Sequence, residues 1–169
     1  MTDCSLATHN SYVAGIGRLL RDLIFRSDKE REIRDLIIGK PPLQKCLTES
    51  RVWNKRIFPE WDNNWSPLHF AAHIGKESIV KLLVEEFGAF VNVKQSSGTW
   101  MGTPLHTAIK ENHPTVVSTL LSYGADVYIS GCDSTSFDSA LHYAEVLSKN
   151  GQDKQEICLL YTSPSPRDS

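Results

Sequence analysis

Apolar residues recur at intervals of three and four along much of this chain, the spacing that places them on one face of an α-helix. The spacing is clearest in four short stretches, which come as two pairs. In each pair, a stretch that includes alanine precedes a stretch rich in leucine, valine or isoleucine. The pattern therefore predicts two helix pairs, with apolar stretches at residues 68–72 and 79–83, and at 105–108 and 116–121.

The residues that flank these stretches carry signals for the start and the end of a helix. Ser66 and Thr103 each precede a proline, and a hydroxyl N-cap followed by proline at the first helical position favours a helix start. Gly75 and Asn112 are placed to end the first helix of each pair, because both residue types tolerate a left-handed backbone. A glycine follows the second helix of each pair and is expected to end it in the same way.

The two predicted pairs are copies of one unit. Ser-Pro-Leu-His begins the first pair at Ser66, and Thr-Pro-Leu-His begins the second at Thr103, 37 residues later. A period of about 33 residues with a Thr-Pro-Leu-His opening is the signature of ankyrin repeats. The two segments, at about 66–92 and 103–127, resemble that family. A third, degenerate copy begins at Ser139, where alanine replaces the proline.

The resemblance implies an all-α fold, an ankyrin-repeat solenoid of helix-turn-helix pairs with projecting hairpin-like fingers. Each repeat of a solenoid buries its apolar face against the next repeat. We therefore expect Leu82 and Leu120 to share one continuous apolar interior. The third copy departs from the pattern after Ala144, so we expect residues 145–157 to be irregular, with a second helix only from Asp153.

The amino-terminal third has helical periodicity without the repeat motif. Residues 12–25 predict one helix, Ser27 is placed to start a second that Gly39 ends, and residues 43–57 predict a third. A solenoid needs a cap, because its first repeat would otherwise expose an apolar face. We expect residues 1–60 to form an N-terminal helical cap or a separate docking segment, followed by an ankyrin repeat domain at residues 61–157.

The last twelve residues, 158–169, differ in character from the rest of the chain. They resemble one reading frame of a sequencing adaptor carried into an assembled transcript. A segment of that origin is not part of the native fold. We expect a non-native tail, with natural sequence that stops near Ile157 and further repeats missing. The alternative is a genuine tail rich in serine and proline.

Composition narrows the class of protein further. The chain has 169 residues, 40% hydrophobic and 22% charged, with a net charge of −2, which suits a soluble globular body without a polyanion-binding surface. The four cysteines show no paired CxxC spacing, and the sequence has no apolar run long enough to cross a bilayer. Because residues 1–10 are polar, we expect no signal peptide. We expect a cytoplasmic protein, with the nucleus as the alternative, that binds neither nucleic acid nor membrane.

One histidine recurs in the opening motif of each copy, which raises the question of a metal site. In ankyrin repeats the Thr and His positions form local hydrogen bonds that fix the turn and tie neighbouring repeats, so the resemblance implies a structural role instead. Walker loops, nucleophile elbows, HExxH motifs and dinucleotide fingerprints are absent from the sequence. We expect no enzyme, no cofactor and no metal. The structural motif positions are Ser66, His69, Thr103, His106, Ser139 and His142.

The resemblance also implies a concave surface lined by the fingers and by exposed positions of each first helix. Trp100 is the sharpest candidate, because tryptophan is favoured at interface centres; alternatively it folds back onto the helices. Ile74 either joins this surface or packs under the neighbouring finger. The candidate partner-binding residues are His73, Ile74, Lys110 and Glu111 on first helices, and Gln95, Trp100, Met101 and Tyr128 on fingers.

The sequence thus predicts a noncatalytic, monomeric scaffold for protein–protein interaction. Two hypotheses for the parent protein stay open. It is an adaptor, for example a ubiquitin-ligase substrate receptor resembling the ankyrin and SOCS-box proteins, or the repeats are the N-terminal regulatory region of a larger enzyme or ion channel. A Cullin-docking box would support the first, and a catalytic or transmembrane segment downstream would support the second.

Overall fold

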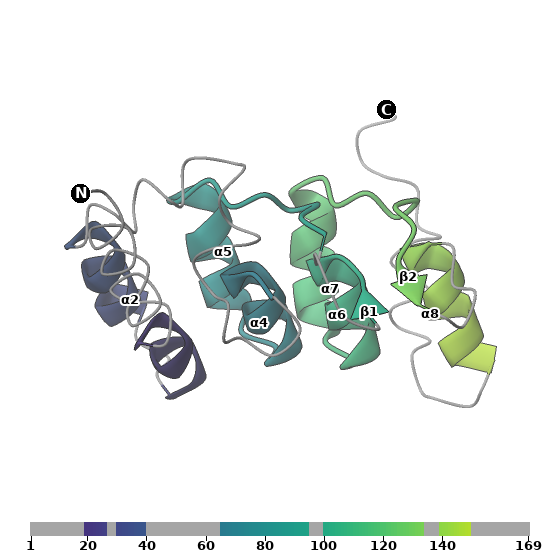
Figure 1. Ribbon diagram of the computed structural model, residues 1–169, viewed down its shortest axis with the longest axis horizontal. Helices are drawn as coiled ribbons and strands as arrows, with labels where there is room; N and C mark the ends of the chain where they lie inside the picture. Colours follow the sequence, from purple (N-terminus) through teal and green to yellow (C-terminus); the bar gives the residue numbers. More distant parts are fainter. Residues whose placement is uncertain (1–18, 27–29, 40–64, 95–99, 134–138, 150–169) are drawn as a thin grey trace, which may run out of the picture.

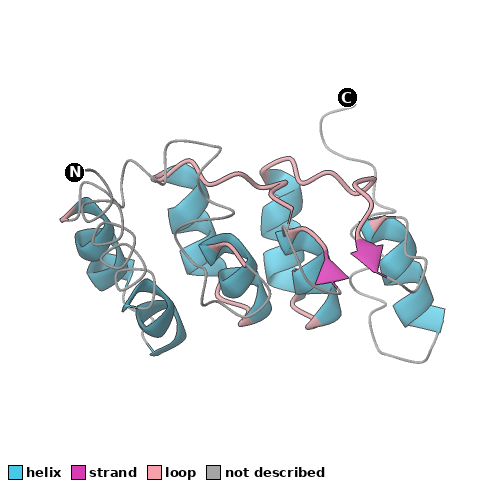
Figure 2. Ribbon diagram, in the orientation of Figure 1, coloured by secondary structure: helices cyan, strands magenta, loops and turns pink. Residues whose placement is uncertain are grey.

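The computed structural model describes residues 19–26, 30–39, 65–94, 100–133 and 139–149, and nearly all of its regular structure is helical (Figures 1 and 2). The all-α prediction is therefore confirmed. Residues 19–26 are helical. They are followed by α2 (Glu30–Ile38), α4 (Pro67–His73), α5 (Glu77–Glu85), β1 (Trp100–Met101), α6 (Pro104–Lys110), α7 (Pro114–Ser122), β2 (Cys132–Asp133) and α8 (Ala140–Lys149).

The helices form two layers in one elongated row (Figure 1). The first helices of successive repeats pack side by side, α4 against α6 and α6 against α8. The second helices form the other layer, in which α2 contacts α5 and α5 contacts α7. Within a repeat, α4 packs on α5 and α6 on α7. This arrangement is the predicted solenoid of stacked helix pairs.

The helices start and end at the residues that the sequence indicates. At the start of α4, the backbone N–H of His69 donates to Ser66 Oγ at 3.3 Å, and at the start of α8 the N–H of His142 donates to Ser139 Oγ at 3.2 Å. Gly75 and Asn112 end the first helices with φ of +75° and 61°, in the left-handed region. The predicted helix ends are confirmed there.

The first helix of the third copy is longer than expected. We predicted irregular structure after Ala144, but α8 continues to Lys149 and is ten residues long, against seven for α4 and α6. The position that holds Gly75 and Asn112 in the earlier repeats holds Ser148 here. Serine does not favour the left-handed conformation that ends the other two helices, so the helix runs on.

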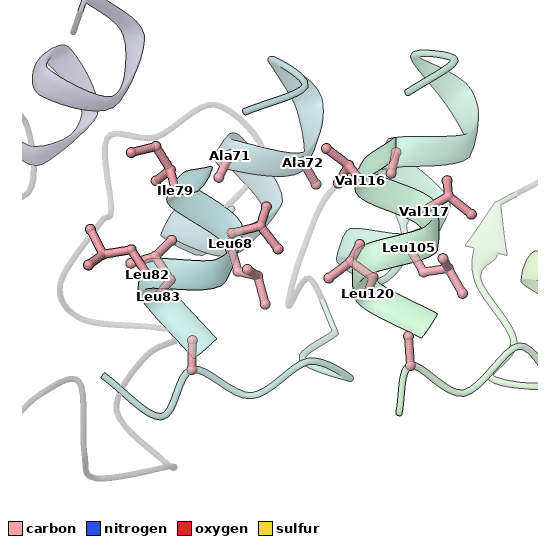
Figure 3. Packing of buried hydrophobic residues seen from close by; sticks show 14 of the residues in the cluster. Leu68, Ala71, Ala72, Ile79, Leu82, Leu83, Leu105, Val116, Val117 and Leu120 are labelled. Carbon is pink, nitrogen blue, oxygen red and sulfur yellow. The ribbon is translucent and has the colours of Figure 1, made fainter. Parts of the chain in front are cut away.

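One apolar interior runs through the described repeats (Figure 3). Leu82 and Leu120 belong to the same cluster of buried residues, as predicted. Leu20 and Ile24 from residues 19–26, and Ile33 and Ile37 from α2, are fully buried in it as well. The amino-terminal helices therefore extend the interior of the repeats.

Several predictions fall outside the described residues. These are the third amino-terminal helix at residues 43–57, the helix from Asp153, and the tail at residues 158–169. The domain boundaries at residues 60 and 157 also stay predictions.

Neighbouring fingers are joined by a short antiparallel pairing. Trp100 lies opposite Asp133, and Met101 lies opposite Cys132. Because β1 leads into α6 and β2 follows the second repeat, the pairing holds two successive fingers side by side.

Candidate functional site

The motif histidines of the first two repeats are buried hydrogen-bonding groups. His69 Nδ1 accepts from the Ser66 hydroxyl at 2.8 Å, and Nε2 then donates to the carbonyl of Gly102, at the start of the next repeat, at 3.1 Å. Burial disfavours the charged imidazolium and lowers the pKa of His69 to about 4. His69 is therefore neutral at physiological pH and joins two repeats.

His106 occupies the same position one repeat later. Its Nδ1 accepts from the Thr103 hydroxyl at 2.9 Å, and burial, with a smaller contribution from Lys94, lowers its pKa to about 4. Its Nε2 is buried and has no hydrogen-bond partner among the described residues. The side chain of His142, in the third copy, is exposed.

His73 and Glu111, two predicted partner-binding residues, face each other across neighbouring repeats. His73 Nδ1 lies 3.3 Å from Glu111 Oε1, and both side chains are about one-third exposed, at 38% and 32%. The Nδ1 atom of His73 is nevertheless buried and makes no hydrogen bond within the described chain. The contact with Glu111 is therefore an ion pair only when the imidazole is protonated. The His73 ring also packs on Trp65, with ring centroids 4.8 Å apart at 58°.

The other candidates differ in exposure. Lys110 and Tyr128 are exposed, Tyr128 at 77%. Ile74 is half-buried and packs against the apolar core. Trp100 and Met101 are described by their backbone alone, and Gln95 lies outside the described residues. The described part of the candidate surface therefore centres on the carboxyl ends of α4 and α6 and on the loop after α7.

His113 has a role that sequence reasoning missed. Its side chain is half-buried, and its Nε2 donates to the His73 carbonyl of the preceding repeat at 2.9 Å. A Cβ on Gly75 would lie 2.6 Å from the His113 ring, so the glycine makes room for the imidazole as well as ending α4. From the sequence, the glycine was identified only as the end of α4.

Asn92 is a second link that sequence reasoning did not identify. Its Nδ2 donates to the carbonyl of Gly124 at 3.3 Å, and its Oδ1 accepts from the backbone N–H of Asp126 at 2.9 Å. Both partners lie in the loop after α7, so one amide side chain joins the corresponding loops of two repeats.

The layer of second helices is tied by charged and polar side chains. Arg34 of α2 makes a two-point ion pair with Glu86. Glu77 accepts from Lys81 at 2.7 Å and from the Thr119 hydroxyl at 3.1 Å. The Arg34–Glu86 and Thr119–Glu77 contacts join neighbouring second helices, whereas Lys81 and Glu77 lie on the same helix.

Within the described part of the chain, no group of three or more histidine, cysteine or acidic side chains is placed to hold a metal ion. None of the described helices has the length and apolar character needed to cross a bilayer.

Stacked helix pairs with paired fingers define this molecule as a helical-repeat solenoid. Residues 33–131 match the family model for ankyrin repeats, with three copies, and the chain belongs to the ankyrin repeat family. The family resemblance predicted from the Pro-Leu-His motifs is confirmed. The matched span begins inside α2, whereas we identified no repeat before Ser66. That earlier part lacks the motif, which explains why sequence reasoning missed a copy.

Relatives of known sequence share the repeats over part of their length. The chain is 39% identical over 69 residues to a putative ankyrin repeat protein of Rickettsia bellii (strain RML369-C), covering 40% of this chain and 27% of that protein. It is 32% identical over 98 residues to ankyrin repeat domain-containing protein 53 of Homo sapiens, covering 56% and 17%. It is 39% identical over 103 residues to the probable E3 ubiquitin-protein ligase XBOS32 of Oryza sativa subsp. japonica, covering 58% and 20%. This chain thus spans less than a third of each of these proteins.

Ankyrin repeats act in protein–protein interaction and are typically noncatalytic. The class of function, protein binding, follows from family membership.

Proposed function

We propose that this protein is a noncatalytic adaptor that binds a protein partner on the surface formed by its first helices and fingers. The observation that carries the proposal is the exposure of side chains at the carboxyl end of α6 and in the loop after α7. The first-helix side presents exposed Lys110, and the adjacent loop presents Tyr128.

The exposed groups on this side suit a protein interface. Tyrosine offers a large apolar face and a hydroxyl, and aromatic residues are enriched at interface centres. The lysine lies at the last turn of α6, next to the half-exposed Glu111. An exposed aromatic side chain and exposed charges of both signs are residue types found in specific interfaces, and Gln95, Trp100 and Met101 are further candidates on the finger.

For the parent protein we favour a substrate-recruiting adaptor of a ubiquitin ligase, acting as a monomer in the cytoplasm, with the nucleus as the alternative compartment. The similarity to the probable E3 ubiquitin-protein ligase of rice supports this proposal. The competing proposal is a regulatory ankyrin region of a larger enzyme or ion channel. A full-length transcript distinguishes the two, because the first requires a Cullin-docking or other ligase segment and the second a catalytic or transmembrane segment.

The binding surface is tested with matched variants. Proteins cross-linked to the chain in cells are identified, and the purified chain is titrated with each of them. Lys110→Glu and Tyr128→Ala should each weaken binding of the true partner by tenfold or more, the effect of losing a central interface contact. Thr115→Ala and Ser118→Ala, at exposed positions of α7, are the controls and should leave the Kd unchanged. Equal affinity of all four variants would exclude this surface.

A further inference from the structure

Two exposed aromatic side chains lie on neighbouring loops at one edge of the row. Phe90 follows α5 and is 52% exposed, and Tyr128 follows α7 and is 77% exposed. The two loops run along the edge where the second helices end (Figure 1), and the Asn92 side chain joins them by its hydrogen bonds to the backbone of Gly124 and Asp126. Both rings lie outside the buried cluster that the described helices form, so they do not serve the core.

Each aromatic residue occupies a position at which the other repeat has a polar residue that holds its loop. Counted from the glycine after the second helix, Phe90 corresponds to Asp126 of the next repeat. The Asp126 carboxylate accepts from the backbone N–H two residues further on, at 2.8 Å, a bond that phenylalanine cannot make. By the same count, Tyr128 corresponds to Asn92, whose amide makes the two loop bonds. At both positions an exposed ring thus replaces a side chain that serves the fold.

The charge around the two rings is negative. The last turns of α5 and α7 carry no basic residue, and the carboxyl ends of both helices present negative partial charge at this edge. Glu85 and Asp126 add carboxylates, whereas the charge of Arg34 is matched by its ion pair with Glu86. The exposed Lys94 acts on the motif histidine of α6 and therefore lies towards the first-helix layer. The edge thus favours a cationic group.

Aromatic rings and carboxylates both recognise the arginine side chain. The face of an aromatic ring attracts a cation, and the planar guanidinium stacks on the ring and also donates to carboxylates. We propose that this edge is a docking site for an extended, arginine-containing segment of a protein partner. Its contact residues are Glu85, Phe90, Asp126 and Tyr128. Alternate side chains of an extended segment point to one side, so one segment can place arginines on both loops.

The inference rests on the proposed function and deepens it, because Tyr128 belongs to both surfaces. It extends the binding surface to Phe90 and names the chemistry of the partner.

Titration of the whole chain with a fluorescein-labelled peptide that alternates arginine with serine tests the site. The control peptide has citrulline, a neutral isostere, in place of every arginine. The arginine peptide should bind at least about tenfold more tightly, as the loss of two exposed cation–π contacts predicts. The difference should shrink at high salt, because exposed charges are screened. Equal binding of the two peptides, or binding of neither, overturns the proposal.

Two variants separate this site from nonspecific binding to exposed rings. Phe90→Asn removes the ring and supplies the acceptor that Asp126 has, so the urea midpoint should hold. Its affinity for the arginine peptide should fall about fivefold, the loss of one cation–π contact. Phe25→Ala removes a phenylalanine that is 66% exposed on the amino-terminal helix, and should leave the affinity unchanged. Equal affinities of the two variants, or a lower urea midpoint of Phe90→Asn with unchanged binding, contradict the proposal.

The proposed function and the docking site can fail separately. If a cross-linked partner depends on Lys110 but the arginine peptide does not bind, the proposed function stands and the docking site is excluded. If Phe90→Asn weakens the arginine peptide while Lys110→Glu leaves the partner's affinity unchanged, the docking site stands and the first-helix surface is excluded.

Discussion

The first complete repeat, α4 with α5, and the second, α6 with α7, are built by the same devices and differ in what they offer to their neighbours. Both first helices begin with a hydroxyl residue, a proline and a buried histidine, and both end at a left-handed residue, Gly75 or Asn112. The outward positions do not repeat in this way: Asn92 is matched by the exposed Tyr128.

The comparison shows that the positions needed for folding are kept in both repeats, whereas the surface positions differ. Backbone geometry and burial constrain the capping and core positions in both complete repeats, because a buried polar group without a partner is costly. A surface position carries no such constraint, so it can either join the next repeat or face another molecule. Within one chain, a link in one repeat and an exposed aromatic residue in the next are alternative uses of the same position.

The largest effect should come from removing the amino-terminal helices. A fragment of residues 61–157 should be marginally stable, and residues 11–157 should be more stable by several kcal/mol. Leu20, Ile24, Ile33 and Ile37 are fully buried in the common interior, and burying one such side chain contributes about 1.5–3 kcal/mol. Denaturant midpoints of the two fragments measure the difference, and equal midpoints would remove the capping role.

Acid should destabilise both complete repeats through their motif histidines. The pKa of His69 and of His106 is about 4 in the folded chain, below the ordinary value of 6.5. Between these values the unfolded chain binds protons that the folded chain does not. Stability is therefore full above about pH 6.5 and falls as the pH drops towards 4, by about 3 kcal/mol for each histidine.

Urea midpoints measured from pH 7.5 to 4 test this dependence. His106→Gln, which lacks a titrating ring, should remove roughly half of the fall in stability between pH 6.5 and 4. A variant that keeps the full pH dependence of the original chain would contradict the assignment to His106.

The left-handed glycines provide a direct comparison between two helix ends. Gly75 and Gly124 both have positive φ, but a Cβ at Gly75 meets the His113 ring, whereas a Cβ at Gly124 has open space. Gly124→Ala should cost about 1–2 kcal/mol, the penalty of a left-handed alanine. Gly75→Ala should cost more, roughly 2–4 kcal/mol, because the His113–His73 link must also shift. Equal melting temperatures for the two variants would show that the imidazole moves aside freely.

The sequence predicted those parts of the fold that local chemistry determines. Ser66, Gly75 and the apolar spacing of residues 79–83 each act within a few residues, so their effects on helix start, helix end and burial follow from the sequence. The roles of His113 and Asn92 could not be predicted in this way. Their partners, the carbonyls of His73 and Gly124, are backbone atoms 40 and 32 residues away and carry no residue-specific signal.

Local chemistry accounts for the length of α8, but it does not identify the residues that face a partner. The absence of glycine or asparagine at Ser148 was visible in the sequence, and its consequence, a longer α8, follows from helix-end chemistry. Which exposed residues face a partner depends on a molecule that is not in the chain. Tyr128 was identified as a candidate binding residue from its position in the repeat. Its 77% exposure agrees with that assignment but does not identify the partner.

The smallest effect on stability should distinguish the linking asparagine from the exposed tyrosine. Asn92→Ala removes two hydrogen bonds to the next loop and should cost about 1–2 kcal/mol, since each contributes about 1 kcal/mol net. Tyr128→Ala should change stability by less than about 0.5 kcal/mol, because the side chain is mostly in solvent. Partner affinity should respond in the opposite order, falling with Tyr128→Ala and holding with Asn92→Ala at a temperature where both are folded. If both variants lowered stability equally and left binding intact, position 128 would be a structural position like position 92, and the division between linking and binding would fail.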